Sequence, residues 1–164
     1  MIRINIMVLT ILLLVSCQST AQKEKKHIKP KEMTYKIEKP DSVWQDELSP
    51  AQFRILRLKG TEQPGTGEYN LTFEKGTYKC AACGTPLFDS DNKYESHCGW
   101  PSFDNAIPGS IQYNRDTSHG MIRTEIVCAT CGGHLGHIFD DGPQETTGKR
   151  YCVNSLSLDF EKKE

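Results

Sequence analysis

The 164-residue sequence lacks two features that would assign it to common functional classes. Its longest largely apolar stretch, Ile4 to Val15, has about a dozen residues, short of the ~20 that a membrane-spanning helix requires. It also lacks an excess of basic residues, because residues 41–164 hold twelve Lys and Arg against eighteen Asp and Glu. Binding to a phosphate backbone requires a positively charged face, so this balance argues against a nucleic-acid-binding protein. The sequence shows no internal repeat apart from two Cys-x-x-Cys units.

The N-terminal segment is typical of an export signal. Arg3 precedes the apolar stretch, which has the length of a secretory h-region. The stretch ends in Leu-Val-Ser-Cys, residues 14–17, which resembles the lipobox of bacterial lipoproteins. We therefore expect residues 1–17 to be a lipoprotein-type signal peptide, cleaved before Cys17, whose thiol is then lipidated. This would make the protein an exported, membrane-anchored lipoprotein on the periplasmic or cell-surface side. An ordinary secretory signal or an uncleaved anchor is the alternative.

Residues 18–40 contain seven lysines, three glutamates and few apolar residues. A segment of this composition cannot bury enough surface to offset the entropy that ordering costs. We expect a disordered tether that holds a folded domain, residues 41–164, away from the membrane. The lysines could contact anionic headgroups, but the composition favours a solvated linker.

The folded domain begins with a helix signal and continues with strand signals. In SPAQFRILRLKG, residues 49–60, Ser49 and Gln52 form an S-x-x-Q capping box, Pro50 suits the first turn, and Gly60 is a natural terminator. Short segments rich in β-branched or aromatic residues follow, separated by Gly, Pro and Asp. They occupy residues 69–73, 76–80, 110–114, 121–128, 137–140 and 150–160. We expect a mainly β, chiefly antiparallel domain preceded by one or two helices.

Four of the seven cysteines form two Cys-x-x-Cys-Gly units, Cys80 with Cys83 and Cys128 with Cys131. Cysteines at this spacing can direct both sulfurs at one tetrahedral ion, and the glycine allows a tight turn beneath it. One such unit alone is compatible with a redox pair, and an export signal makes disulfides the main alternative. Two matching units, with 44 residues between them, favour zinc. Because four thiolates leave no position for water, we expect one structural zinc per chain.

Cys98 and Cys152 lie outside these units. If residues 150–154 form a strand, Arg150, Cys152 and Asn154 share one face. A guanidinium beside a thiol favours the thiolate, and an amide can donate a hydrogen bond to it, which prepares a nucleophile. A buried structural cysteine beside a surface arginine explains this pattern equally well. Cys98 lies in the Gly- and Pro-containing segment SHCGWPSF, which suits a second thiol that moves to meet the first.

Two further features favour a reactive site. GGHLGHIFDDGP brings His134, His137 and Asp141 close together in sequence. Two histidines and a carboxylate can bind a metal or transfer protons; a second metal is less favoured, because four soft thiolates would outcompete this set. Trp100, two residues after Cys98, suits either the core or the apolar wall of a site.

Together these segments resemble a known family. CGWPSF, HLGHIFDDGP and RYCVNS, in this order and framed by the two Cys-x-x-Cys units, resemble the B-type peptide-methionine (R)-S-oxide reductases. The resemblance runs from about residue 41 to residue 160, includes GTEQPGTGEYN, and leaves out residues 1–40. It implies two facing antiparallel sheets, a four-cysteine zinc site opposite the active site, oxidised proteins or peptides as substrates, and a thioredoxin-like reductant. We also expect the domain to act as a monomer.

The resemblance implies a role for each candidate residue. Cys152 would attack the sulfur of methionine sulfoxide and become a sulfenic acid, and Cys98 would then form a disulfide with it for the reductant to reduce. His137 or His134 would protonate the leaving oxygen. The supporting residues would be Arg150 and Asp141 to position and activate the thiolate, Asn154 as a polar site residue, and Trp100 and Phe139 against the substrate. His97 stands where many members have glycine, and its side chain would stiffen the loop that carries Cys98.

Two other functions fit part of the sequence. A zinc-ribbon interaction module accounts for four cysteines, but it gives no role to Arg150, Cys152 and Asn154 or to the histidine pair. A different thiol enzyme, such as a peroxidase, would react faster with peroxide than with sulfoxide. The order and number of the motifs favour the reductase.

Overall fold

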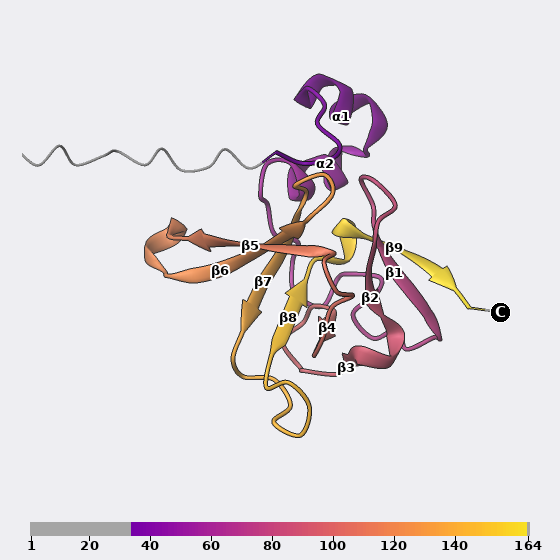
Figure 1. Ribbon diagram of the computed structural model, residues 1–164, viewed down its shortest axis with the longest axis vertical. Helices are drawn as coiled ribbons and strands as arrows, with labels where there is room; N and C mark the ends of the chain where they lie inside the picture. The colour runs from indigo at the N-terminus through magenta and orange to yellow at the C-terminus, as the bar shows by residue number, and fades with distance from the viewer. Residues whose placement is uncertain (1–33, 164) are drawn as a thin grey trace, which may run out of the picture. The chain divides into compact units, whose positions relative to one another are not determined.

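Two antiparallel sheets preceded by two short helices make up the computed structural model, which describes residues 34–163 (Figure 1). The expected signal peptide, Cys17 and residues 18–33 of the expected tether lie outside the described residues. Among residues 34–163, no helix has the length and apolar character needed to cross a bilayer.

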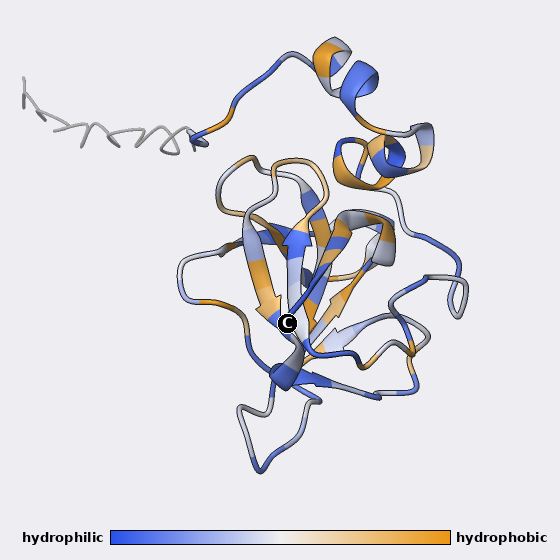
Figure 2. Cartoon of the chain, turned by 90° about the vertical axis from the view of Figure 1, so that its right-hand side faces the viewer, coloured by the Kyte–Doolittle hydropathy of each residue, from blue (hydrophilic) through white to orange (hydrophobic). Residues whose placement is uncertain are grey.

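Helix α1 spans Asp41–Glu47 and helix α2 spans Pro50–Leu56. The capping box is confirmed: the Gln52 backbone N–H donates to Ser49 Oγ, and the Ser49 N–H donates to Gln52 Oε1, both at 3.2 Å. The helix ends before Gly60, however, and the residue with left-handed backbone in the following turn is Lys59, at φ 54°. Buried apolar residues of both helices join the main core, and Figure 2 shows that both helices contain hydrophobic residues among hydrophilic ones.

The sheets differ in size. The smaller sheet has the order β2-β1-β9, with β1 at Gly76–Cys80, β2 at Pro86–Asp89 and β9 at Leu158–Lys162. The larger sheet has the order β3-β4-β8-β7-β6-β5. Its strands are β3 at Lys93–Tyr94, β4 at Ser102–Phe103, β5 at Ile111–Asp116, β6 at Arg123–Cys128, β7 at His134–Phe139 and β8 at Arg150–Val153.

Most of the predicted strands are confirmed, with two corrections. The predicted strand at residues 69–73 is wrong: this segment is irregular, and Leu71 and Phe73 are exposed. The predicted strand at 150–160 is instead two strands, because a 3₁₀ turn at Ser155–Ser157 leads the chain from β8 of the larger sheet to β9 of the smaller one. The chain therefore changes sheets just after Cys152.

The two sheets face each other across an aromatic core. Phe88 of the smaller sheet stacks on Phe103 of the larger one at a ring-centroid distance of 4.4 Å, and Tyr78 meets the same ring edge-on at 5.0 Å. In β8, Tyr151 and Val153 are buried on the core side. Since side chains alternate along a strand, Cys152 points to the opposite, outer face of the larger sheet.

Residues 34–40 were assigned to the tether from their composition, but they contact the domain. The Ile37 N–H donates to the Thr130 carbonyl at 2.9 Å, and Ile37 packs against the core cluster. The Tyr35 ring covers Gly132 so closely that a Cβ there would lie 2.6 Å from it. The contacts of the domain therefore extend several residues ahead of residue 41.

Candidate active site

Cys152 lies in a polar row that crosses the larger sheet. Antiparallel pairing places Cys152 opposite Ser102 of β4 on one side and His137 of β7 on the other. The partners of these residues on the next strands continue the row to both edges of the sheet. From β3 to β5 the row consists of Tyr94, Ser102, Cys152, His137, Glu125 and Asn114. Directly paired residues project to the same face of a sheet. Strand register thus collects these polar side chains from six separate strands.

A cavity of about 120 Å³ adjoins Cys152. It is lined by Thr61, Trp100, Arg123, Gly136, His137, Phe139, Cys152, Val153 and Asn154. The structure therefore brings together five of the residues singled out from the sequence. At Gly136 a Cβ would lie 2.0 Å from the Cys152 carbonyl oxygen, so only glycine permits this approach of β7 to β8. A cavity of this size suits a single side chain, with the aromatic rings of Trp100 and Phe139 as apolar walls.

The Cys98 and Cys152 sulfurs lie 3.7 Å apart. Ser96 Oγ donates to Cys98 Sγ at 3.0 Å, and Ser102 Oγ lies 3.4 Å from the same sulfur. The hydrogen bond from Cys152, helped by these hydroxyls, lowers the pKa of Cys98 to about 4 even though burial opposes the shift. The same bond to Cys98, together with burial, raises the pKa of Cys152, and the nearby Arg150 charge opposes this only in part.

The Arg150-Cys152-Asn154 pattern predicted a thiolate on Cys152, and the Arg150 charge acts in that direction on the pKa of Cys152, against burial and the bond to Cys98. The two sulfurs share one hydrogen bond, in which either can be the donor. The loop that carries Cys98 has left-handed backbone at His97, with φ 58°, and at Gly99, with φ 94°. Glycine is favoured in this region of backbone conformation, so His97 holds the loop in a conformation that costs a non-glycine residue energy.

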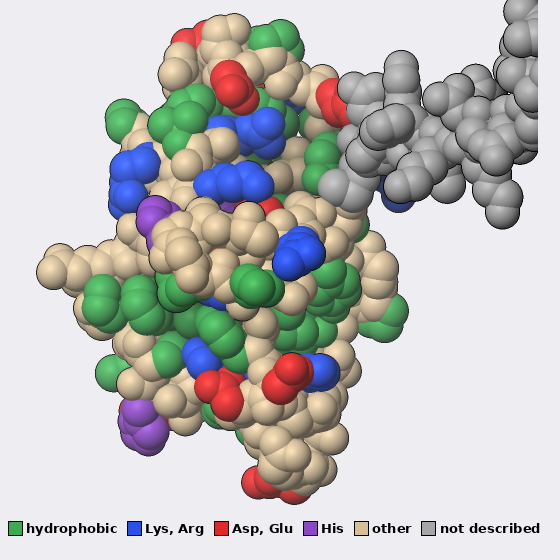
Figure 3. Space-filling view, turned by 90° about the vertical axis from the view of Figure 1, so that its left-hand side faces the viewer, with side chains coloured by type: hydrophobic (Ala, Val, Ile, Leu, Met, Phe, Trp, Pro, Cys, Tyr) green, Lys and Arg blue, Asp and Glu red, His purple; other side chains and the backbone are tan. Residues whose placement is uncertain are grey.

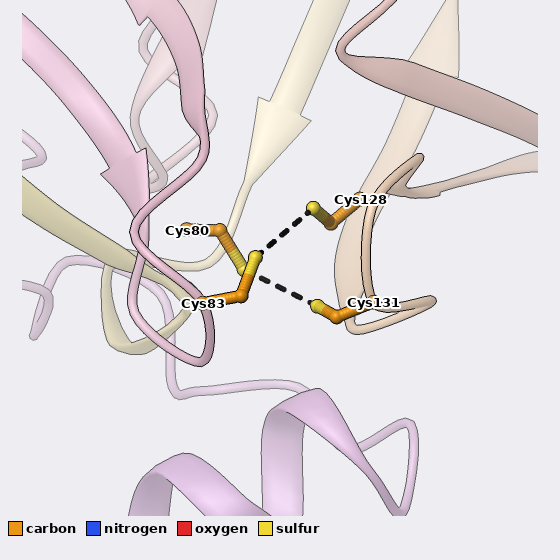
Figure 4. A group of neighbouring side chains, drawn as sticks. All are labelled: Cys80, Cys83, Cys128 and Cys131. Carbon is orange, nitrogen blue, oxygen red and sulfur yellow. Dashed lines mark hydrogen bonds between the residues drawn. The ribbon is translucent and has the colours of Figure 1, made fainter. Parts of the chain in front are cut away.

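The four remaining described cysteines form a separate cluster at the ends of β1 and β6, which belong to different sheets (Figure 4). Their sulfurs lie within 4.8 Å of one another, with Cys80 to Cys131 at 3.7 Å and Cys83 to Cys128 at 3.6 Å. A tetrahedral ion with metal–sulfur bonds of about 2.3 Å requires sulfurs about 3.8 Å apart. The cluster therefore fits a metal ion. No disulfide joins the cysteines of residues 34–163.

The expected glycine turns beneath this cluster are confirmed. Gly84 and Gly132, each directly after the second cysteine of its unit, have left-handed backbone at φ 70° and 72°. Their N–H groups donate to the carbonyls of Cys80 and Cys128 at 2.8 and 2.9 Å, which closes each turn around its sulfurs.

A family model described as SelR domain matches residues 48–162, which include both thiol clusters. This chain belongs to the SelR domain family. Three relatives bear the name "Peptide methionine sulfoxide reductase MsrB". The relative from Leptospira interrogans is 56% identical over 131 residues, 79% of this chain and 99% of the relative. The relative from Agrobacterium fabrum is 55% identical over 127 residues, which are 77% of this chain and 93% of the relative. The relative from Chromohalobacter salexigens is 53% identical over 129 residues, which are 78% of this chain and 97% of the relative.

The two histidines of this SelR domain occupy different positions relative to the thiols. His137 lines the cavity at Cys152, and its Nε2 lies 2.8 Å from Asp116 Oδ2. Burial lowers the pKa of His137, and the hydrogen bond to Asp116 opposes this shift. His134 does not line that cavity; it is buried, with Nδ1 2.8 Å from Glu125 Oε1. Of the two proton donors left open by the sequence, His137 is therefore the one beside Cys152.

Arg150 and Asp141 form a bidentate ion pair near the Cys152 cavity of this SelR domain. Arg150 Nε and Nη2 donate to the two Asp141 carboxylate oxygens, both at 2.8 Å. The guanidinium also lies over the Phe139 ring, 4.5 Å from its centroid. The hydrogen bond from Arg150 lowers the pKa of Asp141. Asp141 thus orients the arginine, and the arginine in turn covers one wall of the Cys152 cavity.

The side chain of Asn154 is bonded to backbone groups, not to the thiol as the sequence suggested. Its Oδ1 accepts from the Glu62 N–H and its Nδ2 donates to the Leu135 carbonyl, both at 3.0 Å. The buried Glu62 carboxylate accepts N–H bonds from Ser155 at 2.7 Å and from the next residue, and the Glu62 carbonyl accepts from Trp100 Nε1 at 3.2 Å. Sequence reasoning missed this role of Glu62, although its segment, GTEQPGTGEYN, carried part of the resemblance.

Proposed function

We propose that this SelR-domain protein reduces methionine (R)-sulfoxide in oxidised proteins and peptides to methionine, with Cys152 as the attacking thiol. The observation that carries the proposal is the pair of close sulfurs, Cys98 and Cys152, beside a cavity walled by Trp100 and Phe139. The names of the relatives agree with this chemistry. The preference for the R epimer rests on the resemblance alone.

In the first step the sulfoxide side chain enters the cavity with its methyl group against Trp100. The Cys152 sulfur attacks the sulfoxide sulfur, and the oxygen requires a proton as its bond to sulfur breaks. His137, which lies opposite Cys152 on β7 and lines the same cavity, would supply this proton. The products are methionine and a sulfenic acid on Cys152, so the oxygen atom is transferred and no external electrons enter at this stage.

In the second step Cys98 recycles the enzyme. Its thiolate attacks the sulfenic sulfur of Cys152, and the released hydroxide takes up a proton to become water. The two sulfurs need to approach from 3.7 Å to the disulfide length of about 2.05 Å, so a small movement of the Cys98 loop suffices. An external dithiol of the thioredoxin type then reduces the disulfide by exchange.

We propose zinc as the ion of the four-cysteine cluster. Four cysteine sulfurs in tetrahedral arrangement are a donor set that Zn²⁺ prefers, and they leave no coordination position for a substrate. When bound, the ion crosslinks the two sheets by way of Cys80 and Cys83 on one side and Cys128 and Cys131 on the other. Metal analysis of the purified domain is expected to give one zinc per chain; thiols that titrate freely with no metal present would contradict this.

The decisive assay of the activity uses separated R and S epimers of a methionine sulfoxide peptide, with dithiothreitol as reductant. The protein is expected to reduce the R epimer only, and Cys152→Ser is expected to abolish the reaction. Cys83→Ser is unsuitable as a control, because it disturbs the metal cluster; Cys98→Ser with dithiothreitol is the matched control. Equal reduction by Cys152→Ser and the wild type would overturn the proposal.

Residues 1–17 support a further part of the proposal, export and anchoring through a lipid on Cys17. The support is the Leu-Val-Ser-Cys sequence after a short apolar stretch. Membrane fractionation of cells that express the full chain is expected to find the wild type with the membranes. Cys17→Ala should move out of that fraction, and a wild type found only among soluble proteins would refute the anchor.

A further inference from the structure

The outer face of the larger sheet, which carries Cys152, has apolar surface in several places. Figure 3 shows the domain from this side, away from the smaller sheet, which lies on the right in Figure 1. Hydrophobic side chains are spread across the middle of the face, with Lys and Arg side chains above them. A methyl group can contact apolar atoms anywhere among them. Recognition of a sulfoxide beside Cys152 therefore requires that the Trp100 ring be held at a set place relative to the thiol.

Glu62 connects Trp100 to the strand that carries Cys152. The Glu62 carbonyl accepts from Trp100 Nε1 at 3.2 Å. The Glu62 carboxylate accepts from the N–H groups of Ser155 and Leu156, at 2.7 and 3.1 Å. These two residues follow closely on β8, which ends one residue after Cys152. A single residue thus bonds both to a wall of the cavity and to the chain that continues from the nucleophile.

The other polar groups of Glu62 and its packing leave it little freedom. The backbone N–H donates to Asn154 Oδ1 at 3.0 Å, and Asn154 lines the cavity. Glu62 is 5% exposed, and Gly67 approaches so closely that a Cβ there would lie 2.6 Å from Glu62 Oε1. Buried polar groups are costly to leave without partners. Since all four polar groups of Glu62 are bonded, this residue resists displacement.

The segment that contains Glu62 also contacts the backbone next to Trp100. The Gly65 N–H donates to the Gly99 carbonyl at 2.7 Å. A Cβ at Gly99, where φ is 94°, would lie 2.7 Å from the Pro64 Cβ, so the two chain segments approach closely. The indole of Trp100 and the residue before it are therefore held by the same segment.

We propose that Glu62 is a positioning residue that fixes the Trp100 ring relative to the Cys152 sulfur. Glu62 does not line the cavity, so it acts through Trp100 and does not touch the substrate. The carboxylate fastens the Glu62 backbone to the chain beyond β8, and the Glu62 carbonyl then orients the indole. The role rests on the proposed reductase activity: the sulfoxide methyl group meets the indole when its sulfur lies in front of Cys152.

Glu62→Gln is the smallest change that breaks this connection. An amide has one acceptor oxygen in place of two, and its NH₂ group would face a backbone N–H, so one of the two N–H groups loses its partner. In single-turnover reduction, the half-saturating sulfoxide concentration is expected to rise roughly fourfold, the effect of losing one buried methyl contact. The maximal rate should change by less than about twofold, because the reacting groups are untouched. Glu68→Gln, at an exposed position of the same segment, is the matched control and should behave as the wild type.

A double-mutant cycle tests whether Glu62 acts through Trp100. Trp100→Phe keeps an aromatic wall but has no N–H to donate. In that background Glu62→Gln should raise the half-saturating concentration no further, whereas independent effects of the two residues would multiply. Glu62→Asp, which keeps both acceptor oxygens on a shorter side chain, replaces Glu62→Gln in the cycle if the latter does not fold. Its effect should also disappear in Trp100→Phe.

The hold on Trp100 can be measured without substrate. The chain has two tryptophans, so Trp44→Phe leaves Trp100 as the only one. In this background Glu62→Gln is expected to increase the quenching of Trp100 fluorescence by acrylamide, because a loosened indole is more accessible. Glu68→Gln should leave the quenching unchanged.

Unchanged quenching in Glu62→Gln, an unchanged half-saturating concentration, or effects that multiply in the double variant would each overturn the positioning role. A wild type that reduces no methionine sulfoxide would refute the reductase activity instead. The quenching experiment would then still decide whether Glu62 holds Trp100, so the two failures are distinguishable.

Discussion

The two thiol clusters of this domain have nearly the same sulfur spacing but different surroundings. The sulfurs of the four-cysteine cluster approach to 3.6 and 3.7 Å, and those of Cys98 and Cys152 to 3.7 Å. The first cluster is enclosed by two tight glycine turns and completes a tetrahedral donor set. The second has only two sulfurs, with serine hydroxyls on one side and a cavity on the other.

Sulfur–sulfur distance therefore does not determine the chemistry of a cysteine in this fold. Four thiolates fill the coordination sphere of a tetrahedral metal ion. Two thiols do not complete such a site, so their sulfurs can accept hydrogen bonds from hydroxyls and react with a substrate. Exposure does not follow this division throughout: Cys80, Cys128 and Cys131 are buried, but Cys83 is half-buried, as Cys98 and Cys152 are.

The largest effect is expected from breaking the four-cysteine cluster. Cys131→Ser should lose the metal and much of the fold, because metal binding at such sites contributes on the order of 10 kcal/mol of apparent folding free energy in small domains. Circular dichroism on heating and metal analysis measure both losses. A Cys131→Ser protein that kept the thermal midpoint of the wild type would show that the cluster is not what joins the two sheets.

The corresponding change in the other cluster should spare the fold and alter turnover. Cys98→Ser is expected to unfold within about 1 kcal/mol of the wild type, because Cys98 lies on a loop outside the core. It should complete one reduction of methionine sulfoxide and then stop when only thioredoxin is supplied. Quantifying methionine per enzyme molecule checks this, and continued thioredoxin-driven turnover would contradict it.

Cys98→Ser should also change the ionisation of Cys152. The hydrogen bond to Cys98 is the largest cause that raises the pKa of Cys152, so its removal should lower that pKa. The pH midpoint of Cys152 alkylation measures this change. A midpoint equal to or above that of the wild type would mean that burial alone keeps Cys152 protonated.

Glu125 contacts His134, and Glu125→Gln should change the stability of the domain in acid. Burial raises the pKa of Glu125, but hydrogen bonds from His134 and Lys59 outweigh it and lower the pKa to about 2 from 4.5. Ionised Glu125 therefore stabilises the fold above about pH 4.5, and this contribution, about 3 kcal/mol, is lost as the pH falls toward 2.

Urea unfolding of the wild type and of Glu125→Gln at several pH values measures this contribution. Acid also releases metal from thiolates, so the informative quantity is the difference in unfolding free energy between the two proteins at each pH. That difference should shrink as the pH falls from 4.5 toward 2, and a constant difference would argue against a lowered pKa of Glu125.

The smallest effect is expected at Asp116. Its hydrogen bond raises the pKa of His137 against the effect of burial, so Asp116→Asn should lower that pKa further. If His137 supplies the proton to the leaving oxygen, the fall in kcat with rising pH should move to lower pH. The loss at pH 7 should be smaller than the ~100-fold that removal of a general acid typically costs. An unchanged pH profile would separate Asp116 from proton transfer.

Local sequence patterns predicted the parts of this fold that local chemistry determines. The capping box of Ser49 and Gln52, the glycine turns after the cysteine pairs, and the outward face of Cys152 all follow from spacing of a few residues. The segment at 69–73 failed because its strand-like composition has no neighbouring strand to pair with.

The partners inside the site could not be predicted in this way. Asn154 and Glu62 are 92 residues apart in sequence, and the bond between them depends on how a loop folds over the end of β8. The hydrogen bonds of Cys98 depend likewise on Ser96 and Ser102, whose distance to Cys98 is set by a loop with left-handed backbone. Periodicity assigns a side chain to a face of a strand, but it does not specify which atoms meet there.

The row of paired residues through Cys152 has a consequence for quality control of this protein. A slip of β8 by one residue against β7 would turn Tyr151 or Val153 outward and bury the thiol. A slip by one residue therefore never leaves the nucleophile facing its cavity. Molecules with this one-residue slip should be inactive, so the specific activity of a preparation falls as their fraction rises.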